Sequence, residues 1–157
     1  MASTIGKKYD FTGKVALITG SSSGIGAAIA LQFAEYGARV TITGRDSETL
    51  KAVGKEIEDK SGHRPLQIHG DFIDQSFANE LIEKTITEYG QLDFLVNNAG
   101  IGTIGGLESE NFMAEFDKVF AINVRAPVHL IKLAAPHLEK TKGNIINISS
   151  IASLVPV

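Results

Sequence analysis

A run of glycines and serines near the start of the chain has the composition of a phosphate-binding turn. It reads Thr-Gly-Ser-Ser-Ser-Gly-Ile-Gly over residues 19–26, between the apolar residues 15–18 and a helical pattern. Gly20 permits a tight turn, and Gly24 and Gly26 let the backbone approach a pyrophosphate, which the N–H groups of a helix N-terminus then hold. Because no Gly-Lys-Ser/Thr sequence follows, the run is not an ATPase-type loop. We predict a dinucleotide site; the alternative is that this G-x-x-x-G-x-G spacing is only a glycine-rich turn.

The residues that end the second predicted strand distinguish two dinucleotides. A carboxylate at this place hydrogen-bonds the adenosine ribose of NAD and repels the 2′-phosphate of NADP. Gly44 and Arg45 occupy the place here, and a guanidinium pairs with a phosphate through two parallel hydrogen bonds. The sequence therefore favours NADP over NAD. Two alternatives remain open: Arg45 is an ordinary solvent-exposed loop residue, or the neighbouring Asp46 weakens the preference.

Short apolar runs alternate with helical patterns along the chain and predict the elements that position these residues. Ile25, Ile29 and Phe33 fall four apart, which predicts the buried face of the first helix, with Ala28 and Ala30 packed around them. Since strand and helix alternate throughout, we expect one α/β domain over residues 1–157 with a doubly wound parallel sheet, a Rossmann fold. The predicted strands are 14–19, 38–43, 66–69, 92–96 and 144–148, and the later helices are 46–61, 77–89 and 110–140.

The composition excludes several classes of partner. The formal net charge is −3, with Lys and Arg scattered along the chain, so nothing indicates a nucleic-acid partner or an anionic membrane surface. No segment approaches the roughly 18 consecutive apolar residues of a membrane span, and the first residues lack the apolar core of a signal peptide. There is no cysteine, and the four histidines have no ligand-like spacing, so no metal is implied. We expect a cytoplasmic protein.

Four motifs, in this order along the chain, resemble those of the classical short-chain dehydrogenases/reductases. They are Thr-Gly-x-x-x-Gly-Ile-Gly at 19–26, Asn-Asn-Ala-Gly at 97–100, Asn123 in the long helix and Ile148-Ser149-Ser150 after the last strand. The resemblance extends from the first strand to the end of the chain, and in general character it is similar to the 3-oxoacyl-carrier-protein reductase and glucose dehydrogenase branches. It implies an NADP-binding Rossmann domain and a small-molecule carbonyl or alcohol substrate.

The resemblance also implies roles for individual residues. Asn97 would tie the central strands together, and Asp71 would hydrogen-bond the adenine amino group, unless it only caps the next turn. Ser150 would polarise the substrate carbonyl, and Asn123 would keep a proton path through a water, unless it is only a helix-kink residue. The implied cofactor-binding residues are Gly20, Ser22, Ser23, Gly24, Ile25, Gly26, Arg45, Asp71, Phe72, Asn98, Ala99, Gly100 and Ile148.

The chain departs from the family at its acid–base pair. The family uses a tyrosine with a lysine four residues later, expected a little beyond Val157, whereas the tyrosines here are Tyr9, Tyr36 and Tyr89. A phenol with an ordinary pKa of roughly 10 is no base at pH 7 without such a lysine. We therefore expect a C-terminally truncated domain that is inactive alone. It would also be poorly soluble, because a sheet face and a strand edge would meet water.

The long helix is expected to contact other parts of a complete protein. Its apolar residues would pack against the helix that follows the last strand and against a second subunit, so the full-length form is expected to be a homo-oligomer, a dimer or tetramer. These residues are Leu130, Ile131, Leu133, Ala134 and Leu138.

The leading hypothesis is an oxidoreductase that transfers a hydride between NADP(H) and a carbonyl or secondary alcohol. The alternative from another class is a non-catalytic nucleotide-binding or subunit-interaction fragment. A nucleotide-dependent transferase or epimerase is less favoured, because Ser150 and Asn123 match the reductase pattern, although the fold alone does not exclude it.

Overall fold

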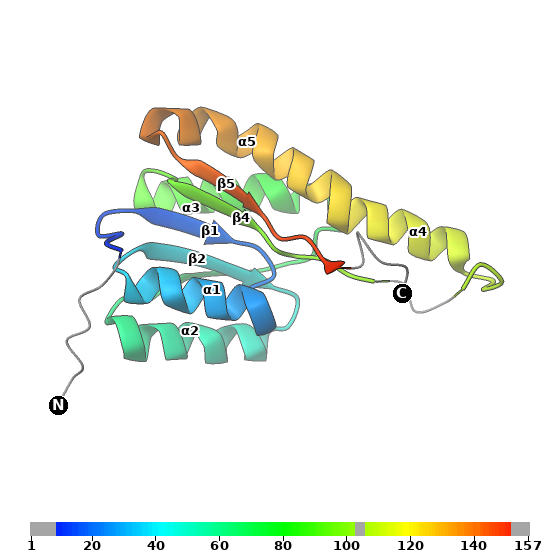
Figure 1. Ribbon diagram of the computed structural model, residues 1–157, viewed down its shortest axis with the longest axis horizontal. Helices are drawn as coiled ribbons and strands as arrows, with labels where there is room; N and C mark the ends of the chain where they lie inside the picture. Colours follow the sequence, from blue (N-terminus) through cyan, green and yellow to red (C-terminus); the bar gives the residue numbers. More distant parts are fainter. Residues whose placement is uncertain (1–8, 103–105, 152–157) are drawn as a thin grey trace.

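The predicted alternation of strands and helices is present in the computed structural model, which describes residues 9–102 and 106–151. The strands are β1 (Val15–Ile18), β2 (Arg39–Gly44), β3 (Leu66–His69), β4 (Phe94–Asn97) and β5 (Asn144–Asn147). The helices are α1 (Gly24–Glu35), α2 (Ser47–Ser61), α3 (Phe77–Tyr89), α4 (Phe112–Phe120) and α5 (Ala126–Thr141), with a π-helical turn η1 (Ala121–Arg125) between the last two. The five described strands are parallel and lie in the order β3-β2-β1-β4-β5. Figure 1 labels the last four of them.

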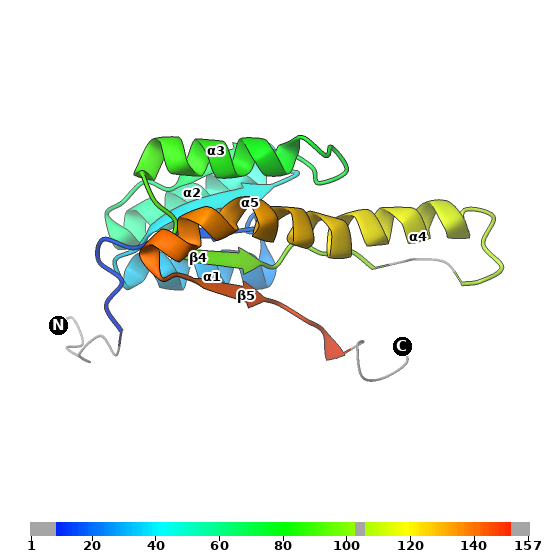
Figure 2. The ribbon, with the colours of Figure 1, turned by 90° about the horizontal axis from the view of Figure 1, so that it is seen from above.

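Each face of the sheet is covered by its own helices, α1 and α2 on one side and α3 and α5 on the other (Figures 1 and 2). Successive side chains of a strand point to opposite faces. Ala16 and Ile18 of β1 accordingly lie in the core under α1 and α2, and Leu17 lies in the core under α3 and α5. Burial on both faces explains why β1 is a continuous apolar run in the sequence. The predicted doubly wound Rossmann fold is confirmed.

The buried face of α1 differs from the predicted one. The prediction is wrong for Ile25, which is 65% exposed, whereas Ile29 and Phe33 are partly buried against the core and Ala30 is buried, as predicted. The buried residues of α1 lie one position later and are Gly26, Ala30 and Ala34. Small side chains at these positions let the helix pack close to the sheet beside the glycine-rich turn.

The predicted helix over 110–140 is a continuous rod made of α4, η1 and α5, and its α4 end extends beyond the sheet (Figure 2). The five apolar residues expected to face other parts of a complete protein pack in this core instead, because α5 lies alongside α3 on the sheet. Leu130, Ala134 and Leu138 are buried there, and Ile131 and Leu133 are partly buried against them. That expectation is therefore wrong for the three buried residues. In the described part of the chain, no helix has both the length and the apolar character needed to cross a bilayer.

β5 is the edge strand of the sheet and is exposed along its whole length. Among the described residues it pairs only with β4, and Ile145, Ile146 and Ile148 are each 36% exposed. An exposed edge of this kind offers unpaired backbone groups to another chain. Poor solubility of the chain alone stays a prediction, to which this edge gives a physical reason.

Candidate cofactor site

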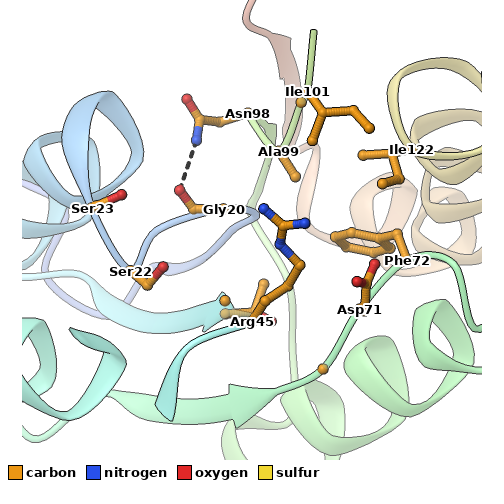
Figure 3. Close-up of a pocket in the computed structure, with 14 residues that line it drawn as sticks. Gly20, Ser22, Ser23, Arg45, Asp71, Phe72, Asn98, Ala99, Ile101 and Ile122 are labelled. Atoms are coloured by element: carbon orange, nitrogen blue, oxygen red, sulfur yellow. Dashed lines mark hydrogen bonds between the residues drawn. The ribbon is translucent and has the colours of Figure 1, made fainter. Parts of the chain in front are cut away.

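A cleft lies where the carboxyl ends of β1, β2 and β4 meet, beside the glycine-rich turn (Figure 3). β2 and β4 flank β1 on opposite sides, so the chain reverses its winding direction there, and ligands of open α/β sheets bind at such a point. The predicted residues that line the cleft are Gly20, Ser22, Ser23, Arg45, Asp71, Phe72, Asn98, Ala99 and Gly100. The lining residues that sequence reasoning missed as cofactor contacts are Thr43, Gly44, Gly70, Ile101 and Ile122.

Four predicted cofactor residues do not line the cleft. Gly24 begins α1, and Ile25 in its first turn is exposed. Gly26 lies behind the turn, where a Cβ atom would collide with the Gly20 carbonyl oxygen and the Asn98 amide nitrogen. Ile148 follows β5, and its backbone N–H donates to the Asn97 carbonyl at 2.9 Å. Gly26 therefore supports the turn from within the fold.

Asn98 holds the glycine-rich turn from the side of β4. Its side-chain Nδ2 donates to the Thr19 carbonyl at 2.9 Å and to the Gly20 carbonyl at 3.0 Å, the bond dashed in Figure 3. In return the Thr19 Oγ1 accepts from the backbone N–H groups of Asn98 and Ala99, each at 2.9 Å. The family resemblance implied only a cofactor-binding role for Asn98, so this role of its side chain was missed. Asn97 does join neighbouring strands, because its Nδ2 donates to the Asn147 Oδ1 at 2.9 Å.

The conformation of the turn fits a pyrophosphate. Gly20 has a φ of 62°, and a Cβ atom there would lie 2.8 Å from the Ala99 Cα, so only glycine suits the position. Gly24 has a φ of 54°. Ser23 is the N-cap of α1, but its side chain makes no capping hydrogen bond. The Ser23 side chain thus does not compete for the N–H groups at the start of α1, where the helix dipole favours an anionic ligand.

Arg45 directly follows β2 and points its side chain into the cleft (Figure 3). Its backbone is fixed by His69, whose Nε2 lies 2.9 Å from the Arg45 carbonyl oxygen. The neighbouring Asp46 is occupied elsewhere: as the N-cap of α2 it accepts from the backbone N–H groups of Thr49 and Glu48, at 2.8 and 2.9 Å. Hydrogen bonds from Thr49 lower the pKa of Asp46, which stays ionised. The Asp46 carboxylate therefore caps α2, while the Arg45 guanidinium faces the cleft.

Asp71 and Phe72 form the wall opposite the turn. The Asp71 Oδ1 accepts from the Ile73 N–H at 3.0 Å, so the carboxylate does cap the next turn, the alternative left open by the sequence. Its side chain nevertheless lines the cleft. Phe72 is held by an edge-on contact with Phe77, with ring centroids 5.1 Å apart. This wall joins a carboxylate to an apolar ring surface.

The two residues predicted to be catalytic lie outside the cleft lining. Asn123 belongs to η1, and its side-chain amide hydrogen-bonds the backbone of Ile101 in the loop after β4. The Asn123 Oδ1 accepts from the Ile101 N–H at 2.9 Å, and the Nδ2 donates to the Ile101 carbonyl at 2.8 Å. Ser150 lies three residues beyond β5 and is exposed. π-Helical turns are rare in proteins, and those that occur are often found at functional sites. Asn123 thus positions the loop that carries Ile101 into the cleft.

Comparison with known proteins identifies the family of the chain. Residues 14–157 match the family model described as short chain dehydrogenase. An uncharacterized oxidoreductase of Thermotoga maritima is 41% identical over 149 residues, which cover 94% of this chain and 58% of that protein. A metagenomic short-chain oxidoreductase solved in complex with NADP has a TM-score of 0.84 and 40% identity, covering 94% of this chain and 66% of that one.

A 7α-hydroxysteroid dehydrogenase complexed with NADH and 7-oxo glycochenodeoxycholic acid has a TM-score of 0.87 and 33% identity, covering 94% of this chain and 57% of that one. The chain thus spans between 57% and 66% of the length of these three proteins. The family match covers every residue from β1 onward, and the two solved structures share the fold at 40% and 33% identity. The chain therefore belongs to the short-chain dehydrogenase family.

Proposed function

We propose that the chain is the cofactor-binding part of an oxidoreductase that uses NADP(H) and a small carbonyl or secondary alcohol. The observation that carries the proposal is the Arg45 guanidinium pointing into a cleft whose other wall is the glycine-rich turn. The position before Arg45 is Gly44, so no carboxylate at the end of β2 opposes a 2′-phosphate. When bound, NADP would supply the nicotinamide that exchanges a hydride with the substrate.

The proposal gives separate tasks to the cleft and to residues outside its lining. The turn from Gly20 to Gly26 holds the pyrophosphate, and Arg45 pairs with the 2′-phosphate. Asp71 and Phe72 hold the adenine, and the backbone of Asn98 to Gly100 passes the ribose. Ile148 lies toward the nicotinamide, Ser150 polarises the substrate carbonyl, and Asn123 keeps Ile101 in place.

We also propose that these 157 residues bind the cofactor without turning it over. Tyr89 is unsuited to acid–base work, because its hydroxyl accepts from the Leu66 N–H and donates to the Val40 carbonyl, and burial raises its pKa. Tyr9 and Tyr36 pack against Phe11, and no tyrosine is among the cleft residues. None of the three tyrosines of this chain is therefore placed at the cleft for proton transfer.

Calorimetry with NADP and NAD, followed by an assay of NADPH oxidation with a panel of small ketones, tests the proposed function. We expect NADP to bind at least about tenfold more tightly than NAD, since one charge-assisted pair is worth roughly 1.5–3 kcal/mol, and we expect no ketone-dependent oxidation. Equal affinities would contradict NADP selection. Turnover would contradict the inactive state, and no binding of either dinucleotide would leave subunit interaction as the function.

A specific surface favours self-association as a second role. Four apolar side chains of the rod are exposed: Phe116, Phe120, Val124 and Val128. The ring centroids of Phe116 and Phe120 are 4.5 Å apart, and Phe120, Val124 and Val128 line one open hollow, so the four share one side of the rod. Monomers rarely expose a contiguous apolar strip, and a two-fold axis would place this strip against itself. We propose a second copy of the chain as the occupant of this rod face.

The change Phe120→Glu with Val124→Glu is expected to convert a dimer into a monomer and to weaken self-association at least about 100-fold, because two like charges would be buried in each copy. Analytical ultracentrifugation of both forms gives the mass. Lys140→Glu, on the same rod but outside the strip, serves as the control and should leave the mass unchanged. A parent chain that stays monomeric at high concentration, or a variant with the parent's mass, would reject the rod face as an interface.

A further inference from the structure

Buried hydrogen bonds clip the glycine-rich turn to the end of β2. The Ser21 N–H donates to the Thr43 carbonyl at 2.8 Å, and the Thr43 N–H donates to the Ser21 Oγ at 2.9 Å. The Ser21 hydroxyl in turn donates to the Ile18 carbonyl at 2.8 Å. Ser21 and Thr43 are 0% and 1% exposed. Separating the turn from β2 would leave these polar groups buried without partners, so the spacing between the two segments is fixed.

Ser22 and Gly44, which directly follow Ser21 and Thr43, lie next to each other beside these hydrogen bonds. A Cβ atom on Gly44 would lie 2.5 Å from the Ser22 Cβ and would also collide with the Ser22 Oγ, whereas the Ser22 Cα would be 3.6 Å away, an ordinary contact. Gly44 is not among the described glycines with a positive φ. The need for glycine at position 44 is therefore steric and comes from the side chain of Ser22. Figure 3 shows Ser22 on the turn beside the end of β2.

Position 44 ends β2, where an acidic residue would bind the ribose hydroxyls of NAD. We propose that Ser22 is a specificity-determining residue, because it fills the space that an acidic side chain at position 44 would need. Ser22 and Gly44 then act as a pair: the serine keeps position 44 free of a carboxylate, and this leaves Arg45 unopposed beside a 2′-phosphate. The inference rests on the proposed function, since it assumes that the cleft holds a dinucleotide.

The pairing predicts a rescue that only one substitution at position 22 can provide. Gly44→Asp alone should lower the Tm of the 157-residue chain by roughly 4–10 °C, as overpacking does, and should weaken binding of both 2′,5′-ADP and AMP. Adding Ser22→Gly should restore the Tm and shift the ratio of the two affinities toward AMP by at least about tenfold. Adding Ser22→Ala instead keeps a Cβ atom in the colliding position, so it should restore neither property.

Calorimetry with 2′,5′-ADP and AMP, together with thermal unfolding, tests the pairing of Ser22 and Gly44 and needs no enzyme activity. The pairing is overturned if Gly44→Asp alone folds like the parent, or if Ser22→Ala rescues as well as Ser22→Gly. A Gly44→Ala cycle with Ser22→Gly isolates the steric part: coupled Tm shifts support the pairing and additive shifts reject it. A parent chain that binds neither probe would overturn the proposed function, while this cycle would still test the steric pairing.

Discussion

Gly26→Ala is expected to disrupt the cleft although it adds only one methyl group. The added Cβ atom would collide with the Gly20 carbonyl oxygen and the Asn98 Nδ2, and the Asn98 amide cannot withdraw without breaking its bonds to Thr19 and Gly20. Overpacking of this kind costs roughly 1–3 kcal/mol and outweighs the gain of about 1 kcal/mol in helix propensity. We expect thermal unfolding to show a Tm lower by about 3–8 °C, and calorimetry to show at least about 100-fold weaker binding of 2′,5′-ADP.

Gly62→Ala is the matched control for this change. This variant also replaces a glycine by alanine, far from the turn. Gly62 has a φ of 74° and open space around its Cβ position, so the loss of stability comes from backbone strain alone. The control should lower the Tm but leave the affinity for 2′,5′-ADP unchanged. If Gly26→Ala bound the probe as tightly as the parent, the close approach of α1 to the turn would not support the cofactor cleft.

The order of strands and helices was predictable because both core layers leave their pattern in the sequence. Parallel strands buried on both faces are apolar throughout, and each is followed by a helical pattern. The start of β4 was predicted two residues early, because Leu92 is buried but lies before the strand. Asp93 beside it anchors the approach to β4, with its carboxylate accepting from the Val15 N–H and from Lys14. Burial alone therefore does not mark where strand pairing begins.

The glycine-rich turn, Arg45 and the loop after β4 were predictable because each is a local motif at the end of a strand. Ile101 and Ile122 were missed as cofactor contacts because their places depend on contacts distant in the sequence. The Asn123 amide fixes Ile101 from 22 residues away. Ile122 lies in the π-helical turn, where the 3.6-residue period that assigns helix faces does not hold. Side-chain collisions such as that of Ser22 with position 44 leave no periodic signal at all.

Arg45→Gln is expected to remove the preference for a 2′-phosphate. The variant should bind 2′,5′-ADP roughly 10- to 100-fold more weakly than the parent, the value of one charge-assisted pair, and should bind AMP with an affinity within about threefold. The phosphate takes its second negative charge near pH 6. In the parent, affinity for 2′,5′-ADP should therefore rise between about pH 5 and pH 7, and Arg45→Gln should flatten this rise. Calorimetry at several pH values measures both effects.

Arg64→Gln provides the control because it removes the same charge outside the cleft, near the start of β3. A general electrostatic effect would weaken binding equally in both variants and would fade as salt screens the charges. Direct pairing would confine the loss to Arg45→Gln and to the probe that carries the 2′-phosphate. Equal loss of 2′,5′-ADP and AMP in Arg45→Gln would mean that Arg45 supports the adenosine site as a whole, and the assignment of NADP would then lose its basis.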